Sequence, residues 1–173
     1  MRTDESVAGK VVIVAGASSG MGEATTRLLA EDGAHVVAVG RRGDQLRELT
    51  SELRGRGLSV VSCPADLRDR EQVERMAATA LEAFGRVEAL IYTAGINRPE
   101  RAITALRPEV WDDMIATNLT GAFHCTQVLL PQMLRQGSGL FVYVSSLSIR
   151  RPDASGVAYK ASKHALTGLA DGV

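Results

Sequence analysis

The stretch that decides the fold runs from Val11 to Gly22 and reads Val-Val-Ile-Val-Ala-Gly-Ala-Ser-Ser-Gly-Met-Gly. Its first five residues are apolar and mostly β-branched, which is typical of a strand buried on both faces. The glycines allow a sharp turn and a close approach of the backbone to another group. The helix expected from Met21 to Glu31 offers free N–H groups and the positive end of its dipole at that turn. This order predicts a site for the pyrophosphate of a dinucleotide, and the simpler alternative is a tight turn without a ligand.

The alternation of strand and helix continues along the whole chain. Asp44 and Asp69 are placed to cap the second and third helices, Pro108 suits the start of a long helix to about Gln136, and a last helix begins near Ser155. Short apolar runs predict four more strands, at residues 35–39, 58–63, 89–92 and 140–144. Buried strands joined by right-handed helical crossovers indicate a doubly wound parallel α/β sheet, the Rossmann fold. We expect one dinucleotide-binding domain over residues 1–173.

Composition excludes several classes of function. Twenty basic residues balance twenty acidic ones, so nothing favours nucleic acid or an acidic membrane surface as a partner. No apolar run approaches the roughly 20 residues of a membrane span, and residues 1–6 are polar, without a signal-peptide core. Cys63 and Cys125 lack metal-ligand spacing, so we expect buried structural thiols and no metal. These features predict a cytoplasmic protein with a small-molecule partner.

Residues that follow the strands match one ordered pattern. The glycines are spaced Gly16-x-x-x-Gly20-x-Gly22, and a Tyr-x-x-x-Lys motif begins thirteen residues after Ser146. With these, the sequence resembles the short-chain dehydrogenase/reductase family over nearly its whole length. The other positions that carry the resemblance are Asp66 after the third strand, Ala94-Gly95 after the fourth, and Asn118 in the long helix.

The resemblance implies an oxidoreductase that transfers a hydride between a nicotinamide cofactor and a ketone, aldehyde or secondary alcohol. It implies four catalytic residues: Asn118, Ser146, Tyr159 and Lys163. The cofactor-binding residues that it implies are Gly16, Ser18, Ser19, Gly20, Met21, Gly22, Arg41, Arg42, Asp66, Leu67, Ala94, Gly95, Tyr159 and Lys163. It also implies a homo-oligomer, either a dimer or a tetramer, for the full-length protein.

The chemistry of the Tyr159 and Lys163 pair agrees with that role. Hydride transfer to a carbonyl needs a proton donor for the developing alkoxide. A free phenol, with a pKa of about 10, is a poor proton shuttle near neutrality. Lys163 lies one helical turn from Tyr159, and a cation at about 4 Å lowers a phenol pKa by roughly 3 units at an effective dielectric of about 20. Ser146 can donate a hydrogen bond to the substrate oxygen, and by resemblance Lys163 also holds the nicotinamide ribose and Asn118 fixes a water. Taken singly, these residues have simpler explanations: Tyr159 and Lys163 as a surface pair, Ser146 as part of a turn, and Asn118 as a buried amide.

The end of the second strand favours NADP(H) over NAD(H). Enzymes that use NAD place an acid there to bind the ribose 2′-hydroxyl, whereas this sequence reads Val39-Gly40-Arg41-Arg42. An arginine binds a 2′-phosphate through a planar fork of donors, and an acid would repel it. We expect Arg41 to be the main contact and Arg42 a second one. Two solvated loop arginines are the alternative.

Two positions depart from the family pattern. The family has threonine before the first glycine and asparagine before Ala-Gly, where this chain has Ala15 and Thr93. We expect the Thr93 hydroxyl to take over the support of the sheet.

The chain ends within the helix that carries Tyr159 and Lys163, and only five strands are predicted where the fold has six or more. We therefore expect a fold cut short before its last strands, with an exposed sheet edge and an exposed apolar face on the last helix. A non-catalytic NADP-binding or interaction module is the alternative function.

Overall fold

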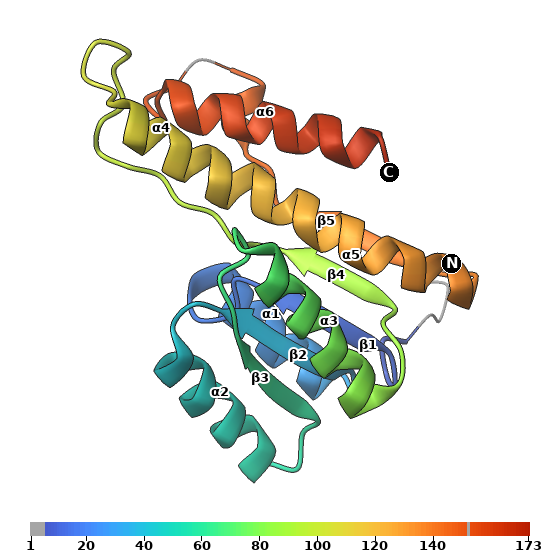
Figure 1. Ribbon diagram of the computed structural model, residues 1–173. Coiled ribbons are helices and arrows are strands. Elements are labelled where there is room, and N and C mark those ends of the chain that lie inside the picture. The colour runs from blue at the N-terminus through green and yellow to red at the C-terminus, as the bar shows by residue number, and fades with distance from the viewer. Residues whose placement is uncertain (1–5, 152) are drawn as a thin grey trace.

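A computed structural model describes residues 6–151 and 153–173; the polar residues 1–5 and residue 152 lie outside the described part. Within it, five parallel strands form one sheet in the order β3-β2-β1-β4-β5 (Figure 1). The strands are β1 (Val11–Ala15), β2 (His35–Gly40), β3 (Val60–Pro64), β4 (Ala89–Tyr92) and β5 (Leu140–Tyr143). The predicted Rossmann fold is confirmed.

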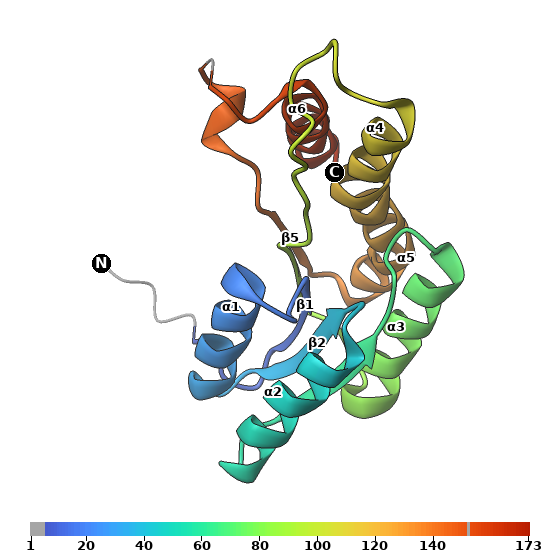
Figure 2. The ribbon, with the colours of Figure 1, turned by 90° about the vertical axis from the view of Figure 1, so that its left-hand side faces the viewer.

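Helices cover both faces of the sheet (Figure 2). One core packs β1 and β2 against α1 and α2, through side chains such as Val14, Leu46 and Leu53. The other packs the opposite face against α3, α5 and α6, through Ile13, Met76 and Leu129. The helices are α1 (Gly20–Glu31), α2 (Gly43–Gly55), α3 (Arg70–Phe84), α4 (Pro108–Ile115), α5 (Gly121–Gln136) and α6 (Val157–Asp171).

Of the two aspartates predicted to cap helices, Asp69 does so and Asp44 does not. The Asp69 carboxylate accepts the Glu71 N–H at 2.9 Å and the Gln72 N–H at 3.4 Å, so the predicted cap of α3 is confirmed. The prediction for Asp44 is wrong, because α2 begins at Gly43 and Asp44 lies inside its first turn. There the carboxylate pairs with Arg47.

The predicted long helix from Pro108 to Gln136 contains a π turn, Ala116–Thr120, between α4 and α5. A π turn inserts one extra residue and often marks a functional site. Before the turn, Val110 and Met114 pack against Ala158 of α6. After it, Ala122 and Cys125 pack against the sheet. The turn thus lets one long helix serve two different contacts.

Gly121 lets α5 approach the sheet closely. A Cβ there would lie 2.5 Å from the Tyr92 hydroxyl and 3.2 Å from Cβ of Leu67. The hydroxyl of Tyr92 donates to the Thr117 carbonyl at 2.7 Å. The end of β4 is therefore tied directly to the π turn.

Thr93 supports the sheet as the sequence led us to expect. Its main-chain N–H donates to the Ala15 carbonyl at 2.9 Å, and its hydroxyl donates to the same carbonyl at 2.8 Å. The hydroxyl thereby strengthens the link between the ends of β1 and β4.

Replacing Thr93 by valine is expected to lower the free energy of unfolding by about 1 kcal/mol, because it removes a partly buried hydrogen bond without changing the side-chain shape. Chemical denaturation of the two proteins measures the difference. Thr104→Val, at an exposed position, is the matched control and is expected to change stability by less than about 0.5 kcal/mol. Equal stability of Thr93→Val and the parent would contradict the supporting role.

β5 forms one edge of the sheet, and its side chains are partly open to solvent. Leu140 is 57% exposed and Val142 is 38% exposed, so the predicted exposed edge is confirmed. The predicted exposure of the apolar face of the last helix is wrong, because Leu166 is fully buried and Leu169 packs against the same core. Both side chains are covered because α6 packs against β5, α4 and the π turn (Figure 1).

Both cysteines are free and buried, as expected. Burial raises the pKa of the Cys125 thiol to about 12, so this side chain is a packing group rather than a nucleophile. Among the described helices, none combines the length and apolar character needed to cross a membrane.

Candidate active site

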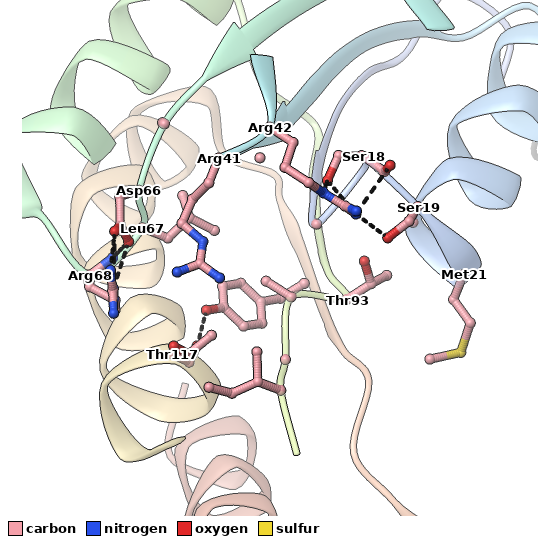
Figure 3. A pocket seen from close by; sticks show the side chains of 18 residues that line it. Ser18, Ser19, Met21, Arg41, Arg42, Asp66, Leu67, Arg68, Thr93 and Thr117 are labelled. Atoms are coloured by element: carbon pink, nitrogen blue, oxygen red, sulfur yellow. Dashed lines mark hydrogen bonds and ion pairs between the residues drawn. The ribbon is translucent and has the colours of Figure 1, made fainter. Parts of the chain in front are cut away.

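A cavity of about 520 Å³ opens at the carboxyl ends of β1, β2, β3 and β4 (Figure 3). This is the edge of a parallel sheet where ligands are expected to bind. Eleven of the predicted cofactor-binding residues line it: Gly16, Ser18, Ser19, Met21, Gly22, Arg41, Arg42, Asp66, Leu67, Ala94 and Gly95. The structure thus gathers residues from four separate strand ends into one site.

The glycine turn after β1 is fixed by close packing. Gly16 has a φ of +94°, and a Cβ there would lie 2.7 Å from the Ala94 nitrogen. Gly20, which starts α1 but does not line the cavity, has a φ of +55°. Ser19 caps α1 with extended backbone and makes no side-chain capping bond. The first-turn N–H groups of α1 are therefore left without a side-chain partner, beside the cavity.

Two arginines follow β2 and enter the cavity by different routes. Arg42 reaches back over the glycine turn, where its guanidinium donates to the Ser18 hydroxyl at 3.1 Å and also to the Ser19 hydroxyl. Figure 3 shows the Arg41 side chain crossing the middle of the cavity, between Asp66 and the glycine turn. Both arginines thus contribute to the lining of the cavity.

Asp66 closes the other end of the cavity in an ion pair. Arg68 donates to both carboxylate oxygens, with contacts from 2.6 to 3.0 Å. These hydrogen bonds lower the pKa of Asp66, with a smaller contribution from the charge of Arg41. Arg68 also donates to Asp113 of α4 at 2.8 Å, and Asp113 pairs with Arg98. Charged side chains therefore connect this end of the cavity to α4 and to the loop after β4.

The predicted catalytic residues of α6 lie beyond the cavity, next to the end of β5. Lys163 is 4% exposed, and its ammonium donates to the Val144 carbonyl at 2.7 Å. The same nitrogen lies 5.9 Å from the centre of the Tyr159 ring. Burial lowers the pKa of Lys163. The two residues are thus brought together on one face of α6.

Asn118 is fully buried in the π turn, and its side chain is held by protein groups. Its Oδ1 accepts the Ile96 N–H at 2.7 Å, and its Nδ2 donates to the Ile96 carbonyl at 3.0 Å and to the Ser162 hydroxyl at 2.9 Å. The amide therefore locks the loop after β4 onto α6. Both of its donors are used, so the side chain acts here as a positioning group, and the predicted bound water stays a prediction.

The two serines after β5 have different surroundings. The Ser145 hydroxyl lies 3.3 Å from the Lys163 carbonyl, to which it donates, and 3.1 Å from the Thr167 hydroxyl. Ser146 begins the 3-10 turn Leu147–Ile149, where its hydroxyl accepts the Ser148 N–H at 3.2 Å. Ser145 is thus directed at the backbone of α6, which agrees with the choice of Ser146 as the catalytic candidate.

Gly95 lies between the cavity and the predicted catalytic residues Asn118 and Lys163. A Cβ there would lie 3.3 Å from Oδ1 of Asn118 and 3.4 Å from Nζ of Lys163. Because Gly95 also lines the cavity, a ligand that fills the cavity can extend past it toward α6. Among the described residues, no three histidine, cysteine or acidic side chains are grouped to hold a metal ion.

Sequence reasoning missed several residues of the cavity wall. Tyr92, Thr93, Ile96 and Arg68 line it, each directly beside a residue that was predicted or two positions from one. Their place at the end of a strand or just after it was the available signal. Thr117, which also lines the cavity, was signalled only by its position next to Asn118.

Comparison with known proteins agrees with this geometry. The family profile described as short chain dehydrogenase matches residues 10–173. Among curated relatives, human dehydrogenase/reductase SDR family member 4 is 34% identical over 98% of this chain. The 3-oxoacyl-(acyl-carrier-protein) reductase of Thermotoga maritima is 34% identical over 93%. The chain belongs to the short-chain dehydrogenase/reductase family of oxidoreductases.

Solved structures show the same fold. A metagenomic short-chain oxidoreductase in complex with NADP superposes with a TM-score of 0.90 and 34% identity, over 96% of this chain and 76% of its own. A variant of actinorhodin polyketide ketoreductase with NADPH gives 0.85 and 34%, over 92% and 62%. The chain spans 61% of the human relative and 65% of the Thermotoga relative, so it is shorter than the proteins it matches.

Proposed function

We propose that the cavity binds NADP(H) and that the protein reduces a ketone or aldehyde, or oxidises the corresponding secondary alcohol. The observation that carries the choice of cofactor is the pair of arginines, Arg41 and Arg42, on the cavity wall at the end of β2. The metagenomic relative bound to NADP and the ketoreductase bound to NADPH support it.

The residues present fit such a cofactor. The free N–H groups at the start of α1 suit a pyrophosphate, and two guanidinium groups suit a 2′-phosphate. At the other end of the cavity, Asp66 and buried Leu67 offer one acceptor carboxylate and one apolar surface, which suit a purine with an exocyclic amine. The donors, charges and apolar surface thus follow the order of groups along the dinucleotide.

In the proposed reaction, each of the predicted catalytic residues has one role. Bound NADPH supplies the hydride that the carbonyl carbon accepts. Tyr159 donates its phenolic proton to the carbonyl oxygen, and the charge of Lys163 favours loss of that proton. The Ser146 hydroxyl donates a hydrogen bond to the same oxygen. Asn118 holds the loop after β4 and α6 at a fixed distance from each other.

Replacing Arg41 by aspartate is expected to shift the preference from NADPH toward NADH. The change removes a cation and adds an anion beside the 2′-phosphate, so the ratio of the two dissociation constants is expected to change by about 100-fold or more, the equivalent of some 2.8 kcal/mol. Titration of the protein with each reduced cofactor, followed by nicotinamide fluorescence, measures both constants.

Arg54→Asp is the matched control, because Arg54 lies in the last turn of α2 and does not line the cavity. It is expected to leave the ratio unchanged. An unaltered ratio in Arg41→Asp and in Arg42→Asp would remove the case for NADP(H). Tight NADPH binding without turnover across a panel of ketones and aldehydes would favour a non-catalytic binding module instead.

A further inference from the structure

One buried hydroxyl on the cavity wall has no hydrogen-bond partner. Among residues 6–151 and 153–173, the Thr117 Oγ1 is the buried side-chain nitrogen or oxygen that lacks one. Buried polar groups in folded proteins are almost always paired, and an exception calls for an explanation. A ligand that supplies the missing partner is such an explanation, because Thr117 lines the candidate cofactor cavity.

Four other helical threonines in this protein show what Thr117 does differently. The hydroxyls of Thr26, Thr79, Thr126 and Thr167 each donate to the main-chain carbonyl four residues earlier, at 2.7 to 3.1 Å. This is the usual way for threonine to satisfy its hydroxyl in a helix. Thr117 lies in the π turn, where the backbone bonds span five residues instead of four, and makes no such bond.

The surroundings of Thr117 indicate which part of a dinucleotide lies near it. The main-chain carbonyl of Thr117 accepts a hydrogen bond from the Tyr92 hydroxyl. The Tyr92 hydroxyl and the Leu67 side chain both lie next to Gly121. Figure 3 places Thr117 on the same side of the cavity as Asp66, Leu67 and Arg68, and places Ser18 and Ser19 of the glycine turn on the other side. Thr117 is therefore at the end that the proposed function assigns to the base.

We propose that the Thr117 hydroxyl is a recognition group for the purine base of the bound nucleotide, and that it gains its hydrogen-bond partner only when the base is in place. This inference rests on the proposed function and adds a residue to it. In helices the threonine side chain has two accessible χ1 positions, and we expect rotation between them to turn the hydroxyl toward the cavity that Thr117 lines. The free protein thus holds an unpaired hydroxyl that the nucleotide satisfies.

Thr117→Val tests the proposal, because the two expected effects have opposite signs. Valine keeps the shape and removes the unpaired hydroxyl, so the melting temperature of the nucleotide-free protein is expected to stay the same or rise by about 2 °C. The affinity for adenosine 2′,5′-diphosphate, measured by calorimetric titration, is expected to fall by about 3- to 10-fold. The affinity for nicotinamide mononucleotide, which lacks the purine, is expected to stay unchanged.

Thr126→Val is the matched control, since the Thr126 hydroxyl is buried and already bonded to the Ala122 carbonyl and to Tyr143. That variant is expected to melt at a lower temperature and to bind the diphosphate as the parent does. The inference would be overturned if Thr117→Val bound the diphosphate with unchanged affinity, or if it lost stability like the control. Either result would leave the proposed function standing. A parent protein that binds neither the diphosphate nor NADPH would overturn the proposed function together with it.

Discussion

Tyr159→Phe is expected to lower the turnover of a carbonyl substrate by about 10²- to 10⁴-fold, the range that general acid catalysis contributes. The ring and its packing on α6 are kept, and only the proton that the substrate oxygen would receive is lost. NADPH affinity is expected to change by less than about 3-fold, because one hydroxyl bond is worth little more than that. Steady-state rates and a cofactor titration on the same preparation separate the two effects.

Tyr143→Phe is the matched control for this experiment. The Tyr143 hydroxyl, on β5, bonds to Thr126 and does not line the cavity. Its removal is expected to leave turnover within about twofold of the parent, with a loss of roughly 1 kcal/mol in stability. Full activity in Tyr159→Phe would remove Tyr159 from the role of acid and base.

Gly22→Ala is expected to lower the free energy of unfolding by about 3 kcal/mol or more. A Cβ at Gly22 would lie 2.2 Å from the Gly16 carbonyl oxygen and 2.6 Å from the Thr93 hydroxyl. Two of the nearest atoms are backbone, so the glycine turn and the start of α1 must separate to accept the methyl group. Since the glycine turn and the start of α1 both line the cavity, NADPH affinity is expected to fall by at least about 10-fold. Denaturant titration and cofactor titration measure the two losses.

Gly168→Ala is the matched control, because a Cβ at that position in α6 meets nothing within 4 Å. Alanine in a helix interior is favoured over glycine by about 0.5–1 kcal/mol, so this variant is expected to be slightly more stable than the parent. Wild-type stability and cofactor affinity in Gly22→Ala would contradict the tight packing at the turn.

The order of strands and helices could be predicted because local pattern and tertiary structure agree in this chain. Buried strands such as β1 and β2 are apolar at nearly every position, and parallel strands require that pattern. The site could be located because the residues after those strands must meet at one edge of the sheet. This is why the glycine turn, Arg41 and Asp66, far apart in sequence, were expected together and line one cavity.

What could not be predicted depends on shifts of a residue or two in where a helix starts, and on which of several possible partners a side chain binds. Both Asp44 and Asp69 are good caps by residue type, but α2 starts two residues earlier than it would with Asp44 as its cap. Arg68 has no motif, and its bond to the Asp66 carboxylate follows only from the folded loop. Composition gives no signal for a π turn, so the buried hydroxyl of Thr117 that lacks a partner could not be predicted before the backbone was known.

The π turn fixes the angular setting of α4 relative to α5. Each residue of a helix advances about 100° around its axis, so deletion of one residue between Ala116 and Thr120 would rotate α4 by that angle against α5. Val110 and Met114 would turn away from α6, and Asn118 would lose its position against Ile96. Insertions and deletions, usually tolerated in loops and at helix ends, are therefore expected to be selected against in this segment during evolution. Sequence alignments of relatives should accordingly keep these five residues free of gaps.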